Sequence, residues 1–199
     1  LPWVTNDGEK FSLIERPEGN AKGSLGRMRA WHGQFGMFVR ALAYMLSHGG
    51  DGLRQVAEDA VLNANYILSG IKDKYHVPYT GTCMHEVLCD DQYLKDTEIT
   101  TFDVAKGLID EGYHPMTIYF PLTAHGAMLI EPTETESRQT LDHFIEALQR
   151  IADRARSDDS NRLRLSPLHA PRRRLDETRA ARQPILRWRN QSTRSATSG

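Results

Sequence analysis

The feature that most constrains the fold is a run of apolar residues between positions 51 and 71. Apolar side chains recur along it every three or four positions, which is the spacing of one face of an α-helix. Asp51 stands before the run and is a residue type that caps helix N-termini. The pattern predicts a long amphipathic helix with one buried face, over residues 51–75. Its apolar positions are Leu53, Val56, Ala57, Ala60, Val61, Ala64, Ile67, Leu68 and Ile71.

A second helical segment precedes this one, from about Phe35 to Ser47, and Gly49 and Gly50 end it. It begins directly after a loop, His32–Gly36, that contains two glycines three positions apart. Such a loop lets the backbone approach a ligand, and the N–H groups at a helix N-terminus suit an anion such as phosphate. A tight helix entry explains the same glycine pair, so both interpretations stay open. A buried face is predicted by the apolar residues Met37, Phe38, Leu42 and Leu46.

Short strands and helices alternate in the rest of the chain up to about residue 155. The first 30 residues contain a turn at Asn6–Gly8 and a candidate strand at Lys10–Ile14. After residue 76 the order of predicted elements is β-α-β-β-α, which describes a small α/β layer packed by two helices. These elements are a strand containing Met84, Val87 and Leu88, a helix from Phe102 to Ile109 closed by Gly112, strands at Met116–Phe120 and Ala127–Ile130, and a helix that begins with a capping box at Thr133–Glu136.

Composition excludes several classes of protein. The chain has 199 residues, 39% of them hydrophobic, which is enough for a core, and its formal net charge of −1 gives no reason to expect nucleic acid or membrane as a partner. Cys83 and Cys89 do not make a disulfide framework. Neither a signal peptide nor a membrane-spanning apolar run is visible, so we expect a cytoplasmic protein. Because residue 1 is Leu and not Met, we expect the sequence to be a truncated one.

Residues 156–199 differ from the rest because arginines outnumber acids and prolines interrupt the run. One interpretation is an arm that binds nucleic acid, but the segment lacks the patterned aromatic residues of a surface that stacks on bases. We favour an extended tail that wraps over a partner subunit, with a short helix near Leu175–Arg182. We expect disorder in Gln191–Gly199.

Candidate chemistry lies in the segment around residue 85. In a strand, Cys83, His85 and Cys89 share one face and offer three metal ligands, but a structural zinc site needs a fourth, so no metal site is predicted. His85 and Glu86 are costly in an apolar strand unless they are paired or functional, and in a strand they point to opposite faces. A structural hydrogen bond and a role at a substrate both stay open for them. Glu131 is expected to stabilise the turn into the following helix.

Several motifs lie in the same order as in a known family. The chain resembles the C-terminal part of the glycine-cleavage-system P-protein family, and more closely the second subunit of its two-subunit bacterial form, over residues 1 to about 188. It departs from the family at Gln34, where Asn is usual, and at His32, where an aromatic residue is usual. The motifs that carry the resemblance are Gly33–Gly36 through Arg40 and Tyr44, Val61–Tyr66, His85-Glu86, Asp103–Lys106, Tyr113–Pro121 and Ile130–Ser137, with a matching tail at Arg173–Glu177 and Ala181-Arg182.

The resemblance implies an α/β fold, the C-terminal part of a pyridoxal 5′-phosphate (PLP)-dependent transferase of fold type I. The implied division is the end of the large PLP-binding domain in residues 1–50, a linking helix in 51–75, a small α/β domain in 76–155, and a basic extended tail in 156–199. The family decarboxylates glycine and passes the aminomethyl group to the lipoyl arm of H-protein. The implied partners are therefore subunit 1, a second copy of subunit 2, lipoylated H-protein and glycine.

The same resemblance implies site residues. PLP must form a Schiff base with an enzyme lysine, and none of Lys10, Lys22, Lys72, Lys74, Lys95 and Lys106 lies in a turn rich in His and Gly like the family's PLP lysine. We therefore expect the anchoring lysine upstream of this chain, and the chain alone to be inactive. The loop of His32, Gly33, Gln34, Phe35 and Gly36 is expected to border the cofactor phosphate. His85 or Tyr119 is expected to line the glycine or lipoyl channel.

The alternative is a non-catalytic βαββα domain that senses a ligand or serves assembly. Such a domain should be stable alone and bind a small molecule alone. A piece of a larger enzyme should instead expose the apolar face of residues 37–46 and self-associate.

Overall fold

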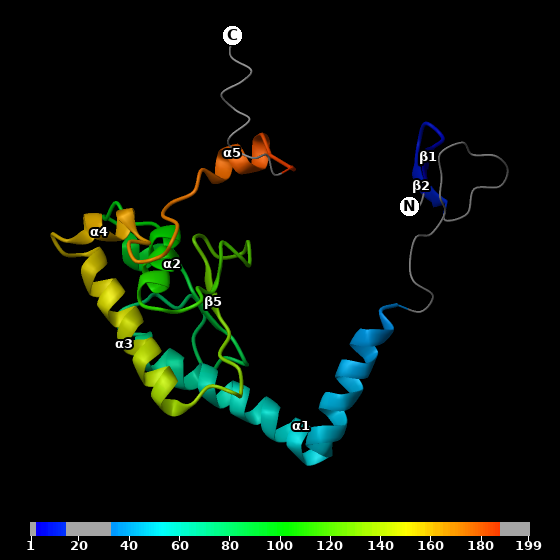
Figure 1. Ribbon diagram of the computed structural model, residues 1–199, viewed down its shortest axis with the longest axis horizontal. Helices are drawn as coiled ribbons and strands as arrows, with labels where there is room; N and C mark the ends of the chain where they lie inside the picture. Colours follow the sequence, from blue (N-terminus) through cyan, green and yellow to red (C-terminus); the bar gives the residue numbers. More distant parts are fainter. Residues whose placement is uncertain (1–2, 15–32, 188–199) are drawn as a thin grey trace, which may run out of the picture. The chain divides into compact units, whose positions relative to one another are not determined.

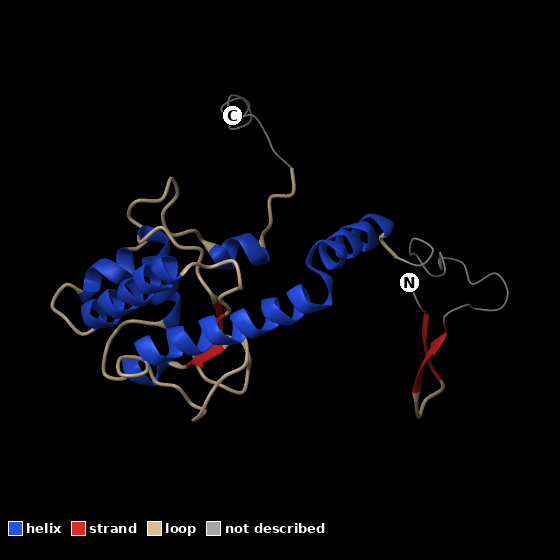
Figure 2. Cartoon of the chain, turned by 90° about the horizontal axis from the view of Figure 1, so that it is seen from below, coloured by secondary structure: helices blue, strands red, loops and turns tan. Residues whose placement is uncertain are grey.

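The computed structural model describes residues 3–14 and 33–187, and it has a mixed α/β architecture with small antiparallel sheets (Figure 1). The chain divides into two compact units, Leu1–Arg54 and Gln55–Gly199. Helices and loops account for most of the described residues, and the strands are short (Figure 2). In the described ranges, no helix is long and apolar enough to cross a membrane.

The first unit contains a β-hairpin, in which β1 (Trp3–Asn6) pairs with β2 (Phe11–Ile14) in antiparallel register. The turn is the predicted one at residues 6–8, and Gly8 supplies its positive φ of 100°. Asp7 Oδ1 accepts hydrogen bonds from the N–H groups of Lys10 at 2.9 Å and Glu9 at 3.0 Å. These two bonds, that from Lys10 first, lower the pKa of the Asp7 carboxyl. The turn of this hairpin is therefore held by contacts among neighbouring residues.

Helix α1 (Phe35–Ile71) begins in the first unit and continues into the second. Its backbone leaves the helical conformation at Gly49, with φ 65° and ψ −178°. Only glycine adopts this conformation at little cost, so the predicted break at the glycine pair is confirmed. Asp51, predicted as the N-cap of a second helix, lies within α1 as the helix is assigned.

The sheet of the second unit has the order β3-β5-β4, and all its pairings are antiparallel. It consists of β3 (Val87–Cys89), β4 (Thr117–Ile118) and β5 (Met128–Ile130). Side chains alternate between faces along a strand, so Val87, Cys89, Met128 and Ile130 share the buried face. Leu88, Leu129 and Thr117 share the other face, which is less buried.

The second half of α1 packs closely against α3 (Arg138–Ala155). A Cβ atom at Gly70 would lie 2.8 Å from Ile145, so glycine permits this close approach. Tyr75 Oη donates to the Leu148 carbonyl at 2.7 Å, and Gln149 Nε2 donates to the Gly70 carbonyl at 2.7 Å. These contacts and the buried Ile67 hold the helix pair over the core.

Helix α2 (Thr101–Asp110) has a complete capping box between Thr100 and Asp103, and Gly112 follows it with a φ of 88°. Both of its ends were close to prediction. The short 3-10 helix η1 (Asp91–Leu94) connects the sheet to this region. The order of elements from β3 to α3 is β-α-β-β-α once η1 is set aside, as predicted.

Residues 160–165, which we expected to be extended, form helix α4 (Ser160–Leu165), and its Leu163 is fully buried. A Cβ atom at Gly107 would lie 3.0 Å from Leu163, so α4 packs directly on α2. Further along, Arg174 Nη2 lies 2.7 Å from Asp103 Oδ1 and donates to the Leu163 carbonyl at 3.0 Å. This part of the basic segment is therefore bound to its own unit.

The predicted short helix near residues 175–182 is present as α5 (Glu177–Arg182), which Asp176 caps through a hydrogen bond from the Arg179 N–H. The expected disorder of residues 191–199 concerns positions outside the described residues.

Two predicted boundaries were wrong. Helix α3 does not begin at residues 133–136, because Ser137 is its N-cap and accepts the Thr140 N–H at 3.1 Å. Thr133 lies instead in a turn, where its carbonyl accepts bonds from the Glu136 N–H at 3.3 Å and from Asn63 Nδ2 at 2.9 Å. The predicted strand at residues 116–120 is shortened to β4 because Tyr119 has a φ of 58°.

Candidate functional site

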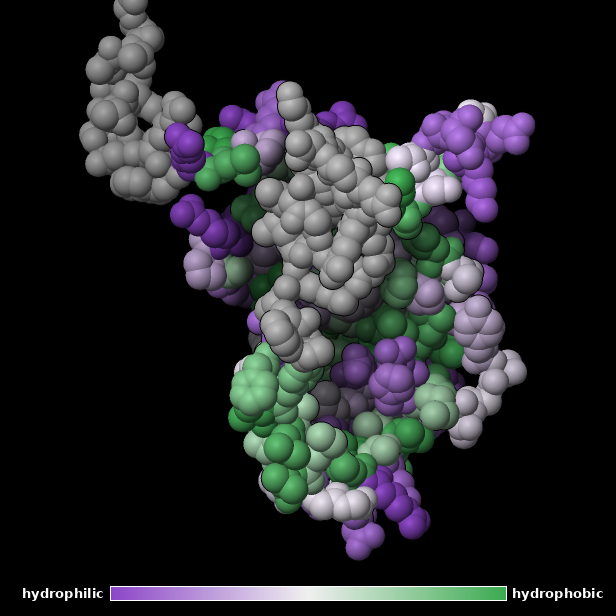
Figure 3. All heavy atoms as spheres, turned by 90° about the vertical axis from the view of Figure 1, so that its right-hand side faces the viewer, coloured by the Kyte–Doolittle hydropathy of each residue, from purple (hydrophilic) through white to green (hydrophobic). Residues whose placement is uncertain are grey.

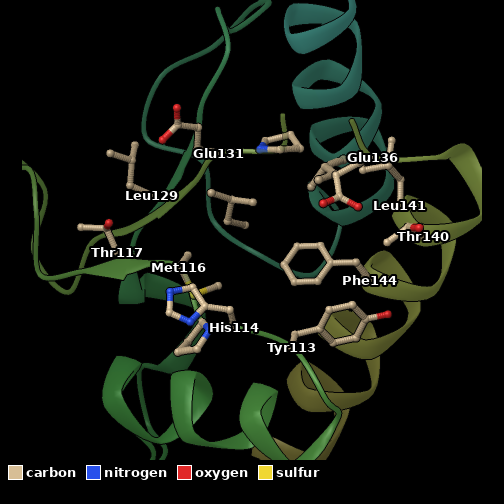
Figure 4. Close-up of a pocket in the computed structure, with 14 residues that line it drawn as sticks. Tyr113, His114, Met116, Thr117, Leu129, Glu131, Glu136, Thr140, Leu141 and Phe144 are labelled. Atoms are coloured by element: carbon tan, nitrogen blue, oxygen red, sulfur yellow. The ribbon is translucent and has the colours of Figure 1, made fainter. Parts of the chain in front are cut away.

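A pocket of about 420 Å³ opens at one end of the sheet, between β5, the loop before β4, and α3 (Figure 4). Its volume is in the range of small-molecule sites, roughly 300–1,000 Å³. Apolar and aromatic side chains make most of its lining, and a few polar groups stand among them. The labelled residues in Figure 4 are Tyr113, His114, Met116, Thr117, Leu129, Glu131, Glu136, Thr140, Leu141 and Phe144.

The aromatic part of the pocket is formed by Tyr113 and Phe144, whose ring centroids are 5.1 Å apart in an edge-on arrangement. Burial raises the pKa of the Tyr113 hydroxyl, Arg150 opposes this effect, and the carboxylates of Glu111, Glu146 and Glu136 add to it. Charges of both signs therefore lie around this aromatic pair.

The carboxylates of the pocket lie on different sides of it. In Figure 4 the carboxylate of Glu136 extends from the start of α3 toward the cavity, and that of Glu131 turns away from it. The side chain of His114 lies on the side of the pocket opposite Glu136. The sequence did not single out His114, Glu136 or Phe144 as site residues.

Glu131 belongs to a second cluster beside the pocket. His85, Glu86 and Glu131 place one ligand atom each within 4.8 Å of one another, and His85 Nε2 lies 3.3 Å from Glu86 Oε1. Among the described residues, this is the group that could offer three ligands to a metal ion. Exposed carboxylates of this kind are common without an ion, and a protonated His85 would itself supply a positive partner. The prediction that Glu131 stabilises the turn into α3 is not supported by a contact of that kind among the described residues.

The prediction that His85 and Glu86 lie in a strand and point to opposite faces was wrong. Strand β3 begins at Val87, which pairs with Ile130, so continuing the ladder would place Glu86 opposite Glu131 and His85 opposite Pro132. Proline has no N–H to donate and restricts the residue before it, so the ladder ends at Ile130. Freed from the sheet, the two side chains turn toward each other.

The predicted shared face of Cys83, His85 and Cys89 was wrong for the same reason. Cys83 lies in the loop, where its N–H donates to Asn65 Oδ1 at 3.0 Å, and it is half-buried. Cys89 is fully buried in β3, and burial raises the pKa of its thiol to about 12. The two cysteines are therefore free thiols in different elements, one in the loop and one in β3.

The two residues predicted to line a substrate channel lie at opposite ends of the sheet. His85 lies at the end where β3 begins and β5 finishes. Tyr119 follows β4 at the other end, where its N–H donates to the Ala127 carbonyl at 2.7 Å. Neither residue lines the pocket described above. The structure does not bring them together.

The glycine loop begins the first unit's helix. His32 lies outside the described residues, and Gly33 has a φ of 122°. The Gln34 carbonyl accepts the N–H groups of Met37 at 2.9 Å and Phe38 at 3.4 Å, which starts the helix. Phe35 is exposed, and a Cβ atom at Gly36 would meet nothing within 4 Å. The described part of the loop, residues 33–36, thus forms a tight helix entry with open space at Gly36.

The described lysines lie outside the pocket, either in ion pairs or exposed to solvent. Lys74 pairs with Asp153, and Lys106 Nζ lies 3.6 Å from Glu177 and 4.6 Å from the Phe102 ring centroid. No lysine among the described residues lines the pocket. Lys10, Lys72 and Lys95 are exposed, and Lys22 lies outside the described residues.

Comparison with known proteins decides the family. Residues 56–169 match the model of the glycine dehydrogenase C-terminal domain, which is more than half of the 199 residues. The chain belongs to the glycine dehydrogenase C-terminal domain family. The resemblance noted in the sequence is thereby confirmed.

Relatives of this glycine dehydrogenase domain extend the match beyond the domain itself. A protein of Caulobacter vibrioides named probable glycine dehydrogenase (decarboxylating) subunit 2 is 60% identical over 190 residues, covering 94% of this chain and 36% of the relative. Proteins of the same name from Staphylococcus haemolyticus and Alkaliphilus oremlandii are each 45% identical. The two alignments cover 95% and 94% of this chain, respectively, and each covers 37% of the relative. The chain thus spans little more than a third of the length of the curated relatives that it matches.

Proposed function

We propose that this chain is the C-terminal portion of a PLP-dependent glycine decarboxylase, the P-protein component of the glycine cleavage system. The observation that carries the proposal is the alignment with proteins named glycine dehydrogenase (decarboxylating) subunit 2 along 94–95% of the chain. In the complete cytoplasmic enzyme, glycine loses its carboxyl carbon as carbon dioxide and the aminomethyl group passes to the lipoyl arm of H-protein. Subunit 1 and a second copy of subunit 2 complete the assembly.

The division of labour within the proposed enzyme follows from the lysines. PLP, when bound, withdraws the electron pair that the departing carboxylate leaves behind. Because none of the six lysines lies in a turn rich in His and Gly like the family's PLP lysine, we propose that the anchoring lysine lies upstream of residue 1. The chain by itself is then inactive. We propose residues 1–50 as the end of the large domain, 51–75 as the linking helix, 76–155 as the small domain and 156–199 as a tail, with the part after α5 reaching a partner subunit.

We propose that the loop of residues 32–36 borders the cofactor phosphate through N–H groups at the start of α1. The support is the open approach at Gly36 and the positive φ of Gly33. In the complete enzyme, Gly36→Val should weaken PLP binding because its side chain fills the open approach. An unchanged dissociation constant for PLP, measured by absorbance titration, would exclude this role for the loop.

We also propose that His85 or Tyr119 lines the path of glycine or of the lipoyl arm. Because the two residues lie at opposite ends of the sheet, one of them at most is close to any single point of that path. His85→Ala and Tyr119→Phe should therefore differ in their effects on KM for glycine and for H-protein. Normal turnover by both variants would eliminate the idea.

A chimeric enzyme tests the function of the chain as a whole. The matched C-terminal residues of the Caulobacter relative are replaced with this chain, and glycine decarboxylation is assayed with lipoylated H-protein, subunit 1 and PLP. Truncating the relative before the replaced segment provides the matched control. We expect the chimera to be active, the truncated relative to be inactive, and this chain alone to be inactive and to form no borohydride-reducible adduct at a single lysine.

Two outcomes would contradict the proposal. An inactive but folded chimera would show that the chain does not serve this enzyme. A stoichiometric PLP adduct on one lysine of the chain alone would show that the cofactor site lies within it. A free-standing sensing or assembly domain remains the alternative, and it predicts an inactive chimera.

A further inference from the structure

The pocket between β5 and α3 carries a charge pattern that the proposed function does not use. Its lining includes two carboxylates, Glu131 and Glu136, and no Lys or Arg. The nearby Arg150 is already held by Glu111 at 2.8 Å and by Glu146 at 3.8 Å. The opening of the pocket is therefore negative at neutral pH and attracts cations in preference to anions.

Glu136 is the carboxylate that a ligand in the pocket would meet. It is exposed and extends toward the cavity beside Phe144 in Figure 4. Within the described ranges, its carboxylate forms no hydrogen bond or ion pair. The other carboxylate, Glu131, turns away from the cavity and gathers with His85 and Glu86. Glu136 thus leaves one unpaired negative group beside an aromatic ring.

The remaining walls of the pocket are mostly apolar and suit the carbon atoms of a ligand. Phe144 and Tyr113 form the aromatic pair, and Met116 and Leu141 add apolar surface. An aromatic face attracts a cation electrostatically and an apolar ligand through burial, so the same wall serves both parts of an amphiphilic cation. His114 lies on the opposite side of the pocket from Glu136.

We propose that this pocket binds a small organic ammonium, a protonated primary amine on a short apolar carbon body. The ammonium lies against the Glu136 carboxylate, and the carbon body lies on Phe144 and Met116. A carboxylate ligand is repelled by Glu136, and an alcohol of the same shape loses the ion pair. This inference goes beyond the proposed function and does not depend on it.

Three probes of one shape test the charge preference on the full 199-residue chain. The probes are 2-phenylethylamine, 2-phenylethanol and 3-phenylpropionate, and binding is followed by ligand-observed NMR titration. We expect the amine to bind more tightly than the alcohol by up to about fivefold, since an exposed ion pair contributes up to about 1 kcal/mol. The carboxylate should bind more weakly than either.

Matched variants locate the binding. Glu136→Gln should remove the preference for the amine over the alcohol. Asp158→Asn removes the same charge from an exposed loop outside the pocket and should leave the preference unchanged. Phe144→Leu keeps an apolar side chain but removes the ring, and it should weaken both the amine and the alcohol.

The proposal is overturned if the three probes bind equally, if none binds at millimolar concentration, or if Glu136→Gln keeps the preference for the amine. Circular dichroism establishes that each variant is folded. Should Glu136→Gln fail to fold, the order of the three probes on the unmodified chain decides the matter alone. Because none of these measurements involves glycine decarboxylation, failure here is distinct from failure of the chimera.

Discussion

The two halves of helix α1 have similar apolar content but different surroundings. In the first half, Leu42 is 53% exposed and Leu46 is 74% exposed, whereas Ile67 and Ile71 in the second half are 1% and 0% exposed. Hydrophobic (green) side chains are plainly visible on the face shown in Figure 3. A helical period therefore predicts which side chains form an apolar face, but it does not predict which element, if any, covers that face. In the second half α3 does so, through contacts such as Gly70 with Ile145.

Truncating one buried and one exposed side chain should separate the two halves most clearly. Ile67→Ala removes a fully buried side chain and should lower the free energy of unfolding by about 3 kcal/mol. Leu46→Ala, at an exposed position, should change it by less than about 0.5 kcal/mol. Urea denaturation followed by circular dichroism measures both. Equal losses in the two variants would mean that both halves are packed alike in solution.

A methyl group added to each half should also act differently. Gly70→Ala places its Cβ 2.8 Å from Ile145 and should lower the free energy of unfolding by about 1–3 kcal/mol. Gly36→Ala meets nothing within 4 Å and should raise helix content slightly, because Ala favours the helix over Gly by about 1 kcal/mol. The comparison would fail if Gly70→Ala were neutral, since the close helix contact would then be absent.

Alkaline pH should lower the free energy of unfolding of the second unit, because its core holds buried cysteine and tyrosine side chains in their protonated form. Burial raises the pKa of Cys89 from 9.0 to about 12 and also raises the pKa of Tyr75 and Tyr93. Above pH 9 the folded state keeps these protons while the unfolded chain releases them. The free energy of unfolding is therefore unaffected by these groups below pH 9 and falls as the pH rises toward 12. For Cys89 the slope is up to about 1.4 kcal/mol per pH unit.

Urea midpoints at pH 7, 9 and 10.5 measure this slope, and Cys89→Ala should make it shallower. A midpoint that rises with pH above 9 would contradict the burial of these groups.

A substitution on the exposed half of α1 should have the smallest effect on the free energy of unfolding, but it should change self-association. Leu42→Glu puts a charge on the apolar face and should leave the urea midpoint of the second unit unchanged. Sedimentation velocity should show less self-association than for the unmodified chain. Asp51→Asn, which changes a charge on the same helix outside the apolar face, serves as the control. If the unmodified chain is monomeric at high concentration, the exposed face does not drive association.

Local rules predicted the elements whose causes are local. The break at Gly49 followed from the freedom of glycine, the hairpin turn from Asn6–Gly8, and the end of α2 from Gly112. Elements that compete with a neighbour were less predictable. Ser137 is the N-cap of α3 in place of Thr133. The Thr133 carbonyl instead accepts hydrogen bonds from the Glu136 N–H in a turn and from Asn63 Nδ2 of α1.

The candidate site depended still more on long-range contacts. His85 and Glu86 were found by their cost in an apolar segment, but their predicted position was wrong because Pro132, in the loop after β5, ends the ladder. Glu136, His114 and Phe144 were not identified together, since no spacing in the sequence links the start of α3 with the loop before β4. Only the packing of α3 beside the sheet brings them around one cavity.

By itself the sequence determined the family, the β-α-β-β-α order and the breaks at glycine, because motif identity and backbone freedom are properties of neighbouring residues. The tertiary structure decided which half of α1 is buried, where β3 begins and which charges surround the pocket. Burial, strand register and electrostatic fields depend on residues far apart in the chain, and those distances exist only once the chain has folded.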